Sequence, residues 1–319
     1  MFVESYLRDL RRERYRPRAV ALYVYRCAHA SARAALERPA AMRGLALAGL
    51  GHLVVLCAAA VALVLRVDRS LGVDFFVATA SWLLGGLVWI GLHLGMFRRD
   101  RELPRSGLGL PNFLTLGRLI CIPAFTVFLL RGSYGLALLA FLVGGATDVA
   151  DGFVARRFGS GTRLGKIFDP VVDVLFNAGV ALALTRAGYL PSWLLALIFL
   201  RYGLLMAGSG WIYIFRGPVA VRPTVLGKTT GVITAGLILA VVLVRHFAPI
   251  GARGPVMDLL HLTLGFVFVL STVQVVIMGI YNIRHLGESA APEGVLSVIV
   301  GAAEGEATAS SGGTPSGDA

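Results

Sequence analysis

The sequence predicts an all-α polytopic membrane protein, with a six-helix transmembrane core preceded by two further transmembrane helices. Of its 319 residues, 56% are hydrophobic and 15% are charged, whereas soluble domains are about one quarter charged. The mean hydropathy is +0.75. The apolar residues gather in runs near the length of about 20 residues that crosses a bilayer as a helix. These runs are 45–65, 75–97, 113–130, 134–150, 166–184, 193–215, 230–244 and 259–283.

Residues 1–43 are rich in arginine and precede the first apolar run. One interpretation is a solvated juxtamembrane segment. The other is an interfacial helix on anionic lipid, anchored by Tyr15, Tyr23 and Tyr25. A cleavable signal is not expected, because the first apolar run begins late and is too long. We therefore divide the chain into a basic segment, a two-helix extension, a six-helix core and a disordered tail, at 1–43, 44–100, 101–286 and 287–319.

A net charge of +12 is common in proteins that bind nucleic acids, but we do not expect this protein to bind them. The basic residues lie mostly in short loops beside apolar runs, where they orient the chain and meet anionic lipid. With the N-terminus in the cytoplasm, the inside loops hold more arginine and lysine than the outside loops. We therefore expect a protein of the cytoplasmic membrane with both termini inside. The three cysteines show neither a disulfide framework nor a zinc spacing.

Four aspartates lie at the edges of apolar runs, in two pairs: Asp148 with Asp151, and Asp169 with Asp173. Carboxylates at membrane depth are costly and indicate a functional site. Separations of three and four residues place each pair on one face of a helix. A helical hairpin with a glycine-containing turn would bring both pairs into one cup at the cytoplasmic face. Carboxylates that converge repel one another unless a cation lies between them, and a divalent metal ion is the simplest candidate.

The residues around these aspartates complete a longer pattern. Gly152 and Ala155 are small, Arg156 is a planar cation suited to phosphate, and Gly165 precedes the second pair. The full pattern, D-x2-D-G-x2-A-R-x8-G-x3-D-x3-D, resembles that of the CDP-alcohol phosphotransferase family of integral membrane enzymes, and the resemblance covers residues 110–284. It implies that CDP-diacylglycerol or another CDP-alcohol reacts with an alcohol to give a phosphodiester and CMP. It also implies a homodimer.

The resemblance further implies roles for the motif residues. Asp148, Asp151 and Asp169 are expected to bind one or two Mg²⁺ or Mn²⁺ ions that hold the pyrophosphate. Asp173 is the expected general base and the fourth residue of the metal group. The nucleotide is expected to contact a set of small, polar and charged residues, with Arg163 also available to phosphate: Asn112, Thr115, Asp148, Gly152, Ala155, Arg156 and Gly165.

A second polar segment, P-N-F-L-T-L-G-R at 111–118, opens the third apolar run. Helix initiation alone accounts for Pro111 and Asn112. The segment is also similar to the first core helix of the family. That similarity puts Asn112, Thr115 and Arg118 at the rim of the cavity, with the first two near the cytidine or its phosphates.

Arg201 lies inside an apolar run and needs an anionic partner, which is either a cup aspartate or the phosphate of the acceptor. Lys228 either snorkels to the membrane surface or joins Arg201 and Arg118 at that phosphate. The expected acceptor is glycerol 3-phosphate, with inositol phosphate, serine or a lipid alcohol as alternatives. Proteins that resemble phosphatidylglycerophosphate synthases usually have lysine at the position of Val174 and an acidic residue at that of Tyr202. The motif therefore points to the reaction more strongly than to glycerol 3-phosphate as the acceptor.

Two other classes of protein compete with the enzyme. An ion-coupled transporter also uses intramembrane carboxylates, but here they cluster at one membrane face and no inverted repeat is visible. A silent scaffold has no use for costly carboxylates at membrane depth.

Overall fold

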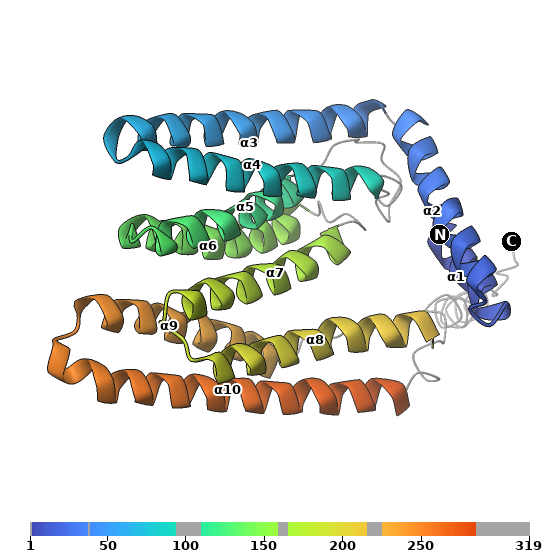
Figure 1. Ribbon diagram of the computed structural model, residues 1–319. Helices are drawn as coiled ribbons and strands as arrows, with labels where there is room; N and C mark the ends of the chain where they lie inside the picture. Colours follow the sequence, from blue (N-terminus) through green and yellow to red (C-terminus); the bar gives the residue numbers. More distant parts are fainter. Residues whose placement is uncertain (1, 38, 94–109, 159–164, 216–224, 285–319) are drawn as a thin grey trace, which may run out of the picture.

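The computed structural model describes residues 2–37, 39–93, 110–158, 165–215 and 225–284. In these residues all regular structure is α-helical. The helices, labelled in Figure 1, are α1 Phe2–Arg12, α2 Pro17–Glu37, α3 Pro39–Arg66, α4 Arg69–Leu92, α5 Leu110–Leu130, α6 Tyr134–Phe158, α7 Gly165–Arg186, α8 Ser192–Phe215, α9 Val225–Phe247 and α10 Ile250–Arg284.

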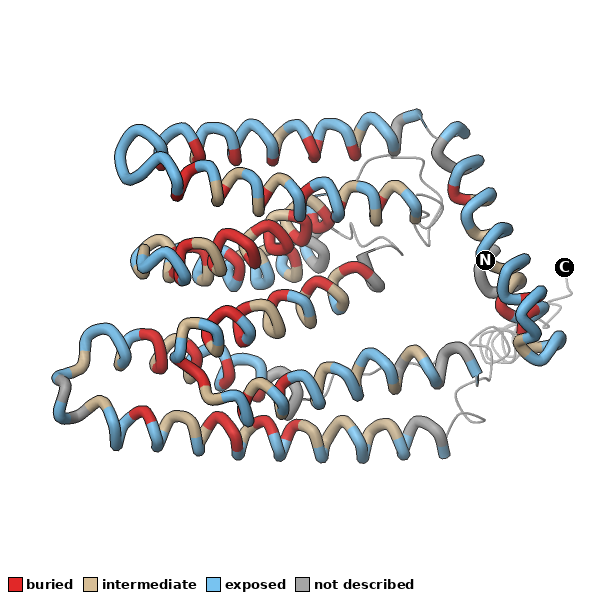
Figure 2. The backbone as a smooth tube through the Cα atoms, viewed as in Figure 1, coloured by how far each residue is buried: buried red, intermediate tan, exposed pale blue. Residues whose placement is uncertain are grey.

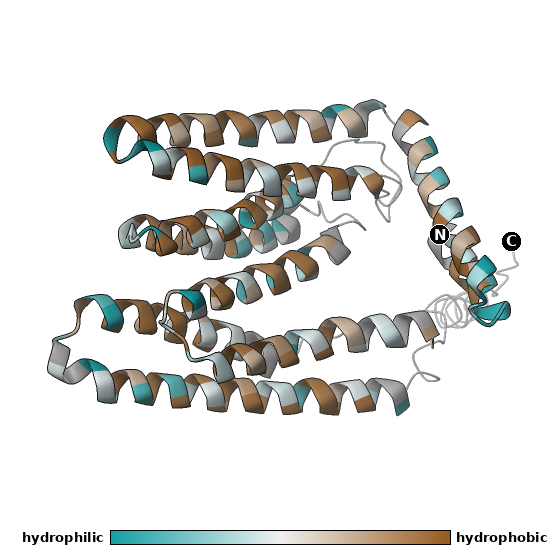
Figure 3. Cartoon of the chain, in the orientation of Figure 1, coloured by the Kyte–Doolittle hydropathy of each residue, from teal (hydrophilic) through white to brown (hydrophobic). Residues whose placement is uncertain are grey.

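The apolar runs form the expected membrane helices, and the protein is a polytopic membrane protein. Seven helices (α3 to α7, α9 and α10) are long and apolar enough to cross a bilayer. Within the described residues, α8 is apolar over the shorter stretch Ser192–Gly208. Hydrophobic residues dominate these helices in Figure 3. Many large hydrophobic residues are exposed, as a lipid-facing surface requires.

Successive membrane helices run in opposite directions (Figure 1), so their connections alternate between the two ends of the bundle. The end of α6 and the start of α7 lie at the same end, which is also where α1 and α2 lie across the bundle. The basic segment at the N-terminus folds mainly as α1 and α2, which pack against each other through Leu7, Leu10 and Ala19. The ring of Tyr15 lies 4.8 Å from that of Phe215 at the end of α8.

Most of the membrane helices begin earlier than the sequence predicts, and local contacts explain this for α4 and α10. Helix α4 starts at Arg69 rather than at residue 75, because Asp68 caps it by accepting a 2.8 Å hydrogen bond from the Leu71 amide. Helix α10 starts at Ile250 rather than at residue 259, so most of the segment between the predicted runs 230–244 and 259–283 is helical. Arg253 donates to the Ala248 carbonyl before the helix, and the buried Met257 packs into the core.

Helix α5 forms the centre of the bundle. Its apolar stretch is 61% buried, against 22% for that of α6 (Figure 2). Glycines let its neighbours approach closely. A Cβ added to Gly179 of α7 would lie 2.5 Å from Ile122 of α5, and one added to Gly144 of α6 would lie 2.4 Å from Phe176 of α7. These contacts fix the spacing of α5, α6 and α7 near the middle of the bundle.

Candidate active site

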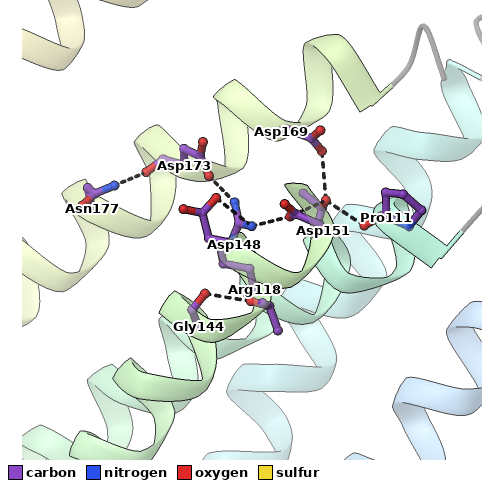
Figure 4. A network of polar contacts seen from close by, with 10 residues as sticks. Pro111, Arg118, Gly144, Asp148, Asp151, Asp169, Asp173 and Asn177 are labelled. Atoms are coloured by element: carbon purple, nitrogen blue, oxygen red, sulfur yellow. Dashed lines mark hydrogen bonds and ion pairs between the residues drawn. The ribbon is translucent and has the colours of Figure 1, made fainter. Parts of the chain in front are cut away.

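The four aspartates meet at one end of the bundle, as the sequence predicts. Asp148 and Asp151 lie near the end of α6, and Asp169 and Asp173 lie near the start of α7. Figure 4 shows both pairs turned toward the same space between these helices. The four carboxylates therefore gather in one cup, although α6 and α7 pack far more on α5 than on each other. The connecting residues 159–164 lie outside the described part of the chain.

The guanidinium of Arg118, from α5, lies between three of these carboxylates (Figure 4). Its Nη2 is 3.0 Å from Asp148 Oδ1 and also donates to Asp151 Oδ2, while Nη1 donates to Asp173 Oδ1. Arg118 is only 2% exposed. Its Nε is buried and has no hydrogen-bond partner among the described residues. One buried cation thus offsets part of the charge of the cup, since a buried carboxylate is tolerated only beside a partner.

Thr115, one helical turn before Arg118, holds the fourth carboxylate. Its Oγ1 lies 2.9 Å from Asp169 Oδ1, 3.4 Å from Asp151 Oδ2 and 3.0 Å from the Pro111 carbonyl. A hydroxyl carries one hydrogen, so these three acceptors share a single donor. Thr115 is fully buried, and its hydroxyl therefore links α5 to both α6 and α7 inside the bundle.

The cup has an open side and a closed side. The side chains of Asp148 and Asp173 are 60% and 45% exposed, whereas that of Asp151 is 9% exposed. A ligand that enters the cup can therefore reach Asp148 and Asp173 directly. Asp173 is further tied to its own helix, because the Asn177 amide donates to its backbone carbonyl at 2.8 Å.

The chemistry of the cup fits a divalent metal ion, since carboxylate oxygens are the ligands that Mg²⁺ and Mn²⁺ prefer. The positions of the side chains differ from those of a metal-loaded site. In the described residues, no three His, Cys, Asp or Glu side chains are grouped so that they could hold one ion. A guanidinium lies where the cation is expected, and the carboxylates face it.

The predicted residues on α5 lie deeper than expected. Asn112 and Arg118 are 2% exposed and Thr115 is fully buried, so these side chains are more enclosed than a position at the rim suggests. The short segment has no feature that reveals its burial, because the burial comes from α4, α6 and α7 packing around α5. Gly152 is half-buried on α6. Ala155 and Arg156 lie on α6, and Gly165 begins α7. The surroundings of these three residues are outside the described part of the chain, and so is Arg163 as a whole.

Arg201 of α8 does not pair with the aspartates. Its Nε donates to Ser271 Oγ of α10 at 2.7 Å, and its guanidinium carbon lies 4.8 Å from the ring of Tyr202 and 5.8 Å from that of Phe268. Among the described residues it forms no ion pair. Sequence reasoning missed Ser271, which is a single small polar residue in a long apolar run. Lys228 lies in the first turns of α9, and its side chain is outside the described residues.

Residues 108–283 match the CDP-alcohol phosphatidyltransferase family. The chain belongs to this family. The matched region contains the four aspartates, Arg118 and Arg201, whereas α1 to α4 lie outside it.

Similar curated proteins carry two kinds of name. The chain is 36% identical over 124 residues to a "Putative cardiolipin synthase" of Mycobacterium tuberculosis, covering 38% of this chain and 58% of that protein. It is 33% identical over 109 residues to "Cardiolipin synthase (CMP-forming)" of Streptomyces coelicolor, covering 32% and 51%. It is 31% identical over 140 residues to "CDP-diacylglycerol--glycerol-3-phosphate 3-phosphatidyltransferase" of Aquifex aeolicus, covering 42% and 75%. The chain thus spans a little over half the length of the first relatives it matches.

Proposed function

We propose that this phosphatidyltransferase family member transfers a phosphatidyl group from CDP-diacylglycerol to an alcohol and releases CMP, as a step of phospholipid synthesis. The observation that carries the proposal is the cup itself. Four acids of the family motif, from two helices, meet at the end of the bundle, where three contact the buried cation of Arg118 and the fourth accepts from Thr115. Glycerol 3-phosphate is the proposed acceptor, and inositol phosphate, serine or a lipid alcohol are the alternatives. The names of the Aquifex and Streptomyces relatives support this class of reaction.

The proposed reaction is an in-line displacement at the phosphorus that bears the diacylglycerol. The acceptor hydroxyl oxygen forms the new P–O bond, the bond to CMP breaks, and CMP leaves with its electron pair. The hydroxyl proton passes to the carboxylate of Asp173. A substrate can reach this carboxylate because its side chain is partly exposed. One or two Mg²⁺ or Mn²⁺ ions held by Asp148, Asp151 and Asp169, with Asp173 adjoining, would supply charge neutralisation at the pyrophosphate.

The nucleotide of the donor is proposed to lie along α5 and α6, near Asn112, Thr115 and Gly152. Ala155, Arg156 and Gly165 complete the proposed nucleotide site. Gly152, Ala155 and Arg156 belong to α6 and Gly165 to α7, the helices that carry the four aspartates, whereas Asn112 and Thr115 belong to α5. The small residues leave room for the nucleotide, and Arg156 would face its phosphates.

Arg201 is proposed to bind the phosphate of the acceptor, together with Lys228 and Arg118. A guanidinium inside a membrane helix needs an anion, and among the described residues no carboxylate pairs with Arg201, which lies beside the Ser271 hydroxyl, the Tyr202 side chain and the ring of Phe268. A guanidinium can form a fork with phosphate oxygens.

The cup is proposed to face the cytoplasm, with both chain termini on that side. Supporting this, the helices of the arginine-rich segment 1–43 lie at the same end of the bundle as the aspartates (Figure 1). A homodimer is proposed from the family resemblance. Multi-angle light scattering of the detergent-solubilised chain would check that assembly.

The test of the reaction uses purified full-length protein in mixed micelles. It is incubated with CDP-diacylglycerol, Mg²⁺ or Mn²⁺ and a panel of acceptors, while CMP and the lipid product are followed. Replacing Asp173→Asn should lower turnover by about 10²–10⁴-fold, as expected for loss of a general base, while CDP-diacylglycerol still binds. Asp74→Asn is the matched control, because Asp74 pairs with Arg131 away from the cup. Absence of CMP release with every acceptor contradicts the proposal.

A further inference from the structure

Arg118 is in an unusual position for a residue of a proposed metal site. The cup carries four carboxylates and, among the described residues, this one guanidinium contacts three of them. The contacts use Asp148 Oδ1, Asp151 Oδ2 and Asp173 Oδ1. A metal ion at the centre of the cup would need oxygens of the same carboxylates, so the ion and the guanidinium compete for one place. In the described residues no three acids form a metal site while Arg118 is bound between them.

The guanidinium is not fully satisfied in this position. Its Nε is buried without a partner in the part of the chain that the structure describes, and the whole side chain is 2% exposed. A buried donor without an acceptor costs free energy, which makes this arrangement less stable relative to one in which Nε is paired. The open side of the cup, at Asp148 and Asp173, gives the guanidinium a direction in which to move.

We propose that Arg118 is an exchangeable counter-ion: it bridges the aspartates in the metal-free protein and is displaced when a divalent cation binds. The inference rests on the proposed function, because it takes the cup to be a metal site. Two roles follow for one side chain. Before loading, Arg118 holds α6 and α7 together against the repulsion of their carboxylates. After loading, its guanidinium is free to bind a substrate phosphate, so that metal binding precedes phosphate binding.

The exchange makes a prediction that an ordinary stabilising residue does not. The apparent affinity of a site falls with the fraction of molecules that are competent to bind. If the bridged form outweighs the open form by ten to one, removing the bridge raises the affinity for metal by about tenfold. Arg118→Gln should therefore bind Mn²⁺ at least about tenfold more tightly than the wild type, with Arg118→Lys between the two. A residue that merely orients the ligands would give weaker binding on substitution.

The experiment measures free Mn²⁺ by electron paramagnetic resonance in titrations of the full-length protein in detergent, without substrate. Arg131→Gln is the matched control, because it removes an arginine–aspartate pair, with Asp74, that lies outside the cup. It should bind Mn²⁺ within about twofold of the wild type, since charges that far from the site are screened. Thermal unfolding gives a second reading: Mn²⁺ should raise the melting temperature of Arg118→Gln more than that of the wild type.

A third measurement needs no variant. Phenylglyoxal modifies exposed arginines, and peptide mapping by mass spectrometry locates the label. Arg118 should be protected in the metal-free wild type and labelled after Mn²⁺ is added. Equal or weaker Mn²⁺ binding by both Arg118 variants, or an Arg118 that stays unlabelled with saturating Mn²⁺, overturns the exchange and leaves the proposed reaction standing. A wild type that binds no Mn²⁺ overturns the metal site and the exchange together.

Discussion

The close approach of α6 and α7 at Gly144 gives a quantitative prediction. A Cβ added at Gly144 would lie 2.4 Å from Cε2 and 2.6 Å from Cζ of the Phe176 ring, which is far inside van der Waals contact. Phe176 is itself 7% exposed and stacks near Phe141, with ring centroids 6.1 Å apart, so the ring cannot swing away freely. Overpacking of this kind costs about 1–3 kcal/mol.

The neighbouring residue supplies the control. A Cβ added at Gly145 meets nothing within 4 Å. Both substitutions to alanine gain about 0.5–1 kcal/mol of helix propensity, and this gain cancels in the comparison. The difference between Gly144→Ala and Gly145→Ala is therefore the packing cost alone, about 1–3 kcal/mol.

Thermal unfolding in detergent, followed by circular dichroism, measures this difference. A change of 1 kcal/mol moves the melting temperature of a chain of this size by about 2 °C, so Gly144→Ala should melt about 2–6 °C below Gly145→Ala. Phe176→Leu, which lacks the ring atoms in question, should close most of this gap in a double-mutant cycle. Because Gly144 lies one turn before Asp148, Gly144→Ala should also lower turnover more than Gly145→Ala does. Melting temperatures within 1 °C of each other would refute the reasoning.

The remaining predictions concern the hydroxyl of the cup, the acceptor site and a helix cap. Thr115→Val keeps the shape of the side chain but removes the donor to Asp169, and loss of a bond to a charged group should cost about 1.5–3 kcal/mol in unfolding free energy, with Thr115→Ser restoring most of it. Arg201→Gln should raise KM for glycerol 3-phosphate by about tenfold or more in steady-state assays, with little effect on binding of CDP-diacylglycerol. Ser271 only orients the guanidinium, so Ser271→Ala should raise KM by a smaller factor. Hydrogen bonds from the Ser70 hydroxyl and from backbone amides lower the pKa of Asp68 from its ordinary 3.8, so its stabilisation is present above that value and is lost as the pH falls through the lowered pKa. Asp68→Ala should therefore melt below the wild type at neutral pH, and the two melting curves should converge in strong acid.

The sequence is informative about the cup because the relevant interactions are local. The spacing of Asp148 with Asp151, and of Asp169 with Asp173, is a property of single helices, and one short connection brings the two helices together. The apolar runs likewise predict membrane helices one at a time. Both predictions agree with the structure.

Arg118 shows what local patterns miss. It lies 33 residues before Asp151 and 55 before Asp173, and its place between them depends on how α5 packs against α6 and α7. That packing comes from single small residues, such as Gly179 against Ile122, whose partners lie far away in the sequence. The start of α10 at Ile250 also differs from the predicted run at 259–283. Burial of Met257 and the hydrogen bond from Arg253 favour a helix in the residues before that run.

The two-helix extension, α3 and α4, lies outside the region that matches the family, yet it packs directly on the elements of the cup. A Cβ added to Gly86 of α4 would lie 2.8 Å from both Leu116 and Leu119, which flank Arg118 on α5. One turn further along α4, Trp89 stacks on Phe168 of α7, with ring centroids 5.1 Å apart.

Phe168 is 3% exposed and immediately precedes Asp169 in α7. The ring of Phe113, at the start of α5, in turn lies 4.1 Å from that of His52 in α3. The extension therefore supports α5 and α7 on the side away from α6. Since α5 supplies Arg118 and α7 supplies two of the aspartates, the geometry of the cup depends on packing that the family motif does not contain. A truncated protein that lacks α3 and α4 would expose this apolar face of α5. It would also lose the contact of Trp89 with Phe168 beside Asp169, even though every motif residue is retained.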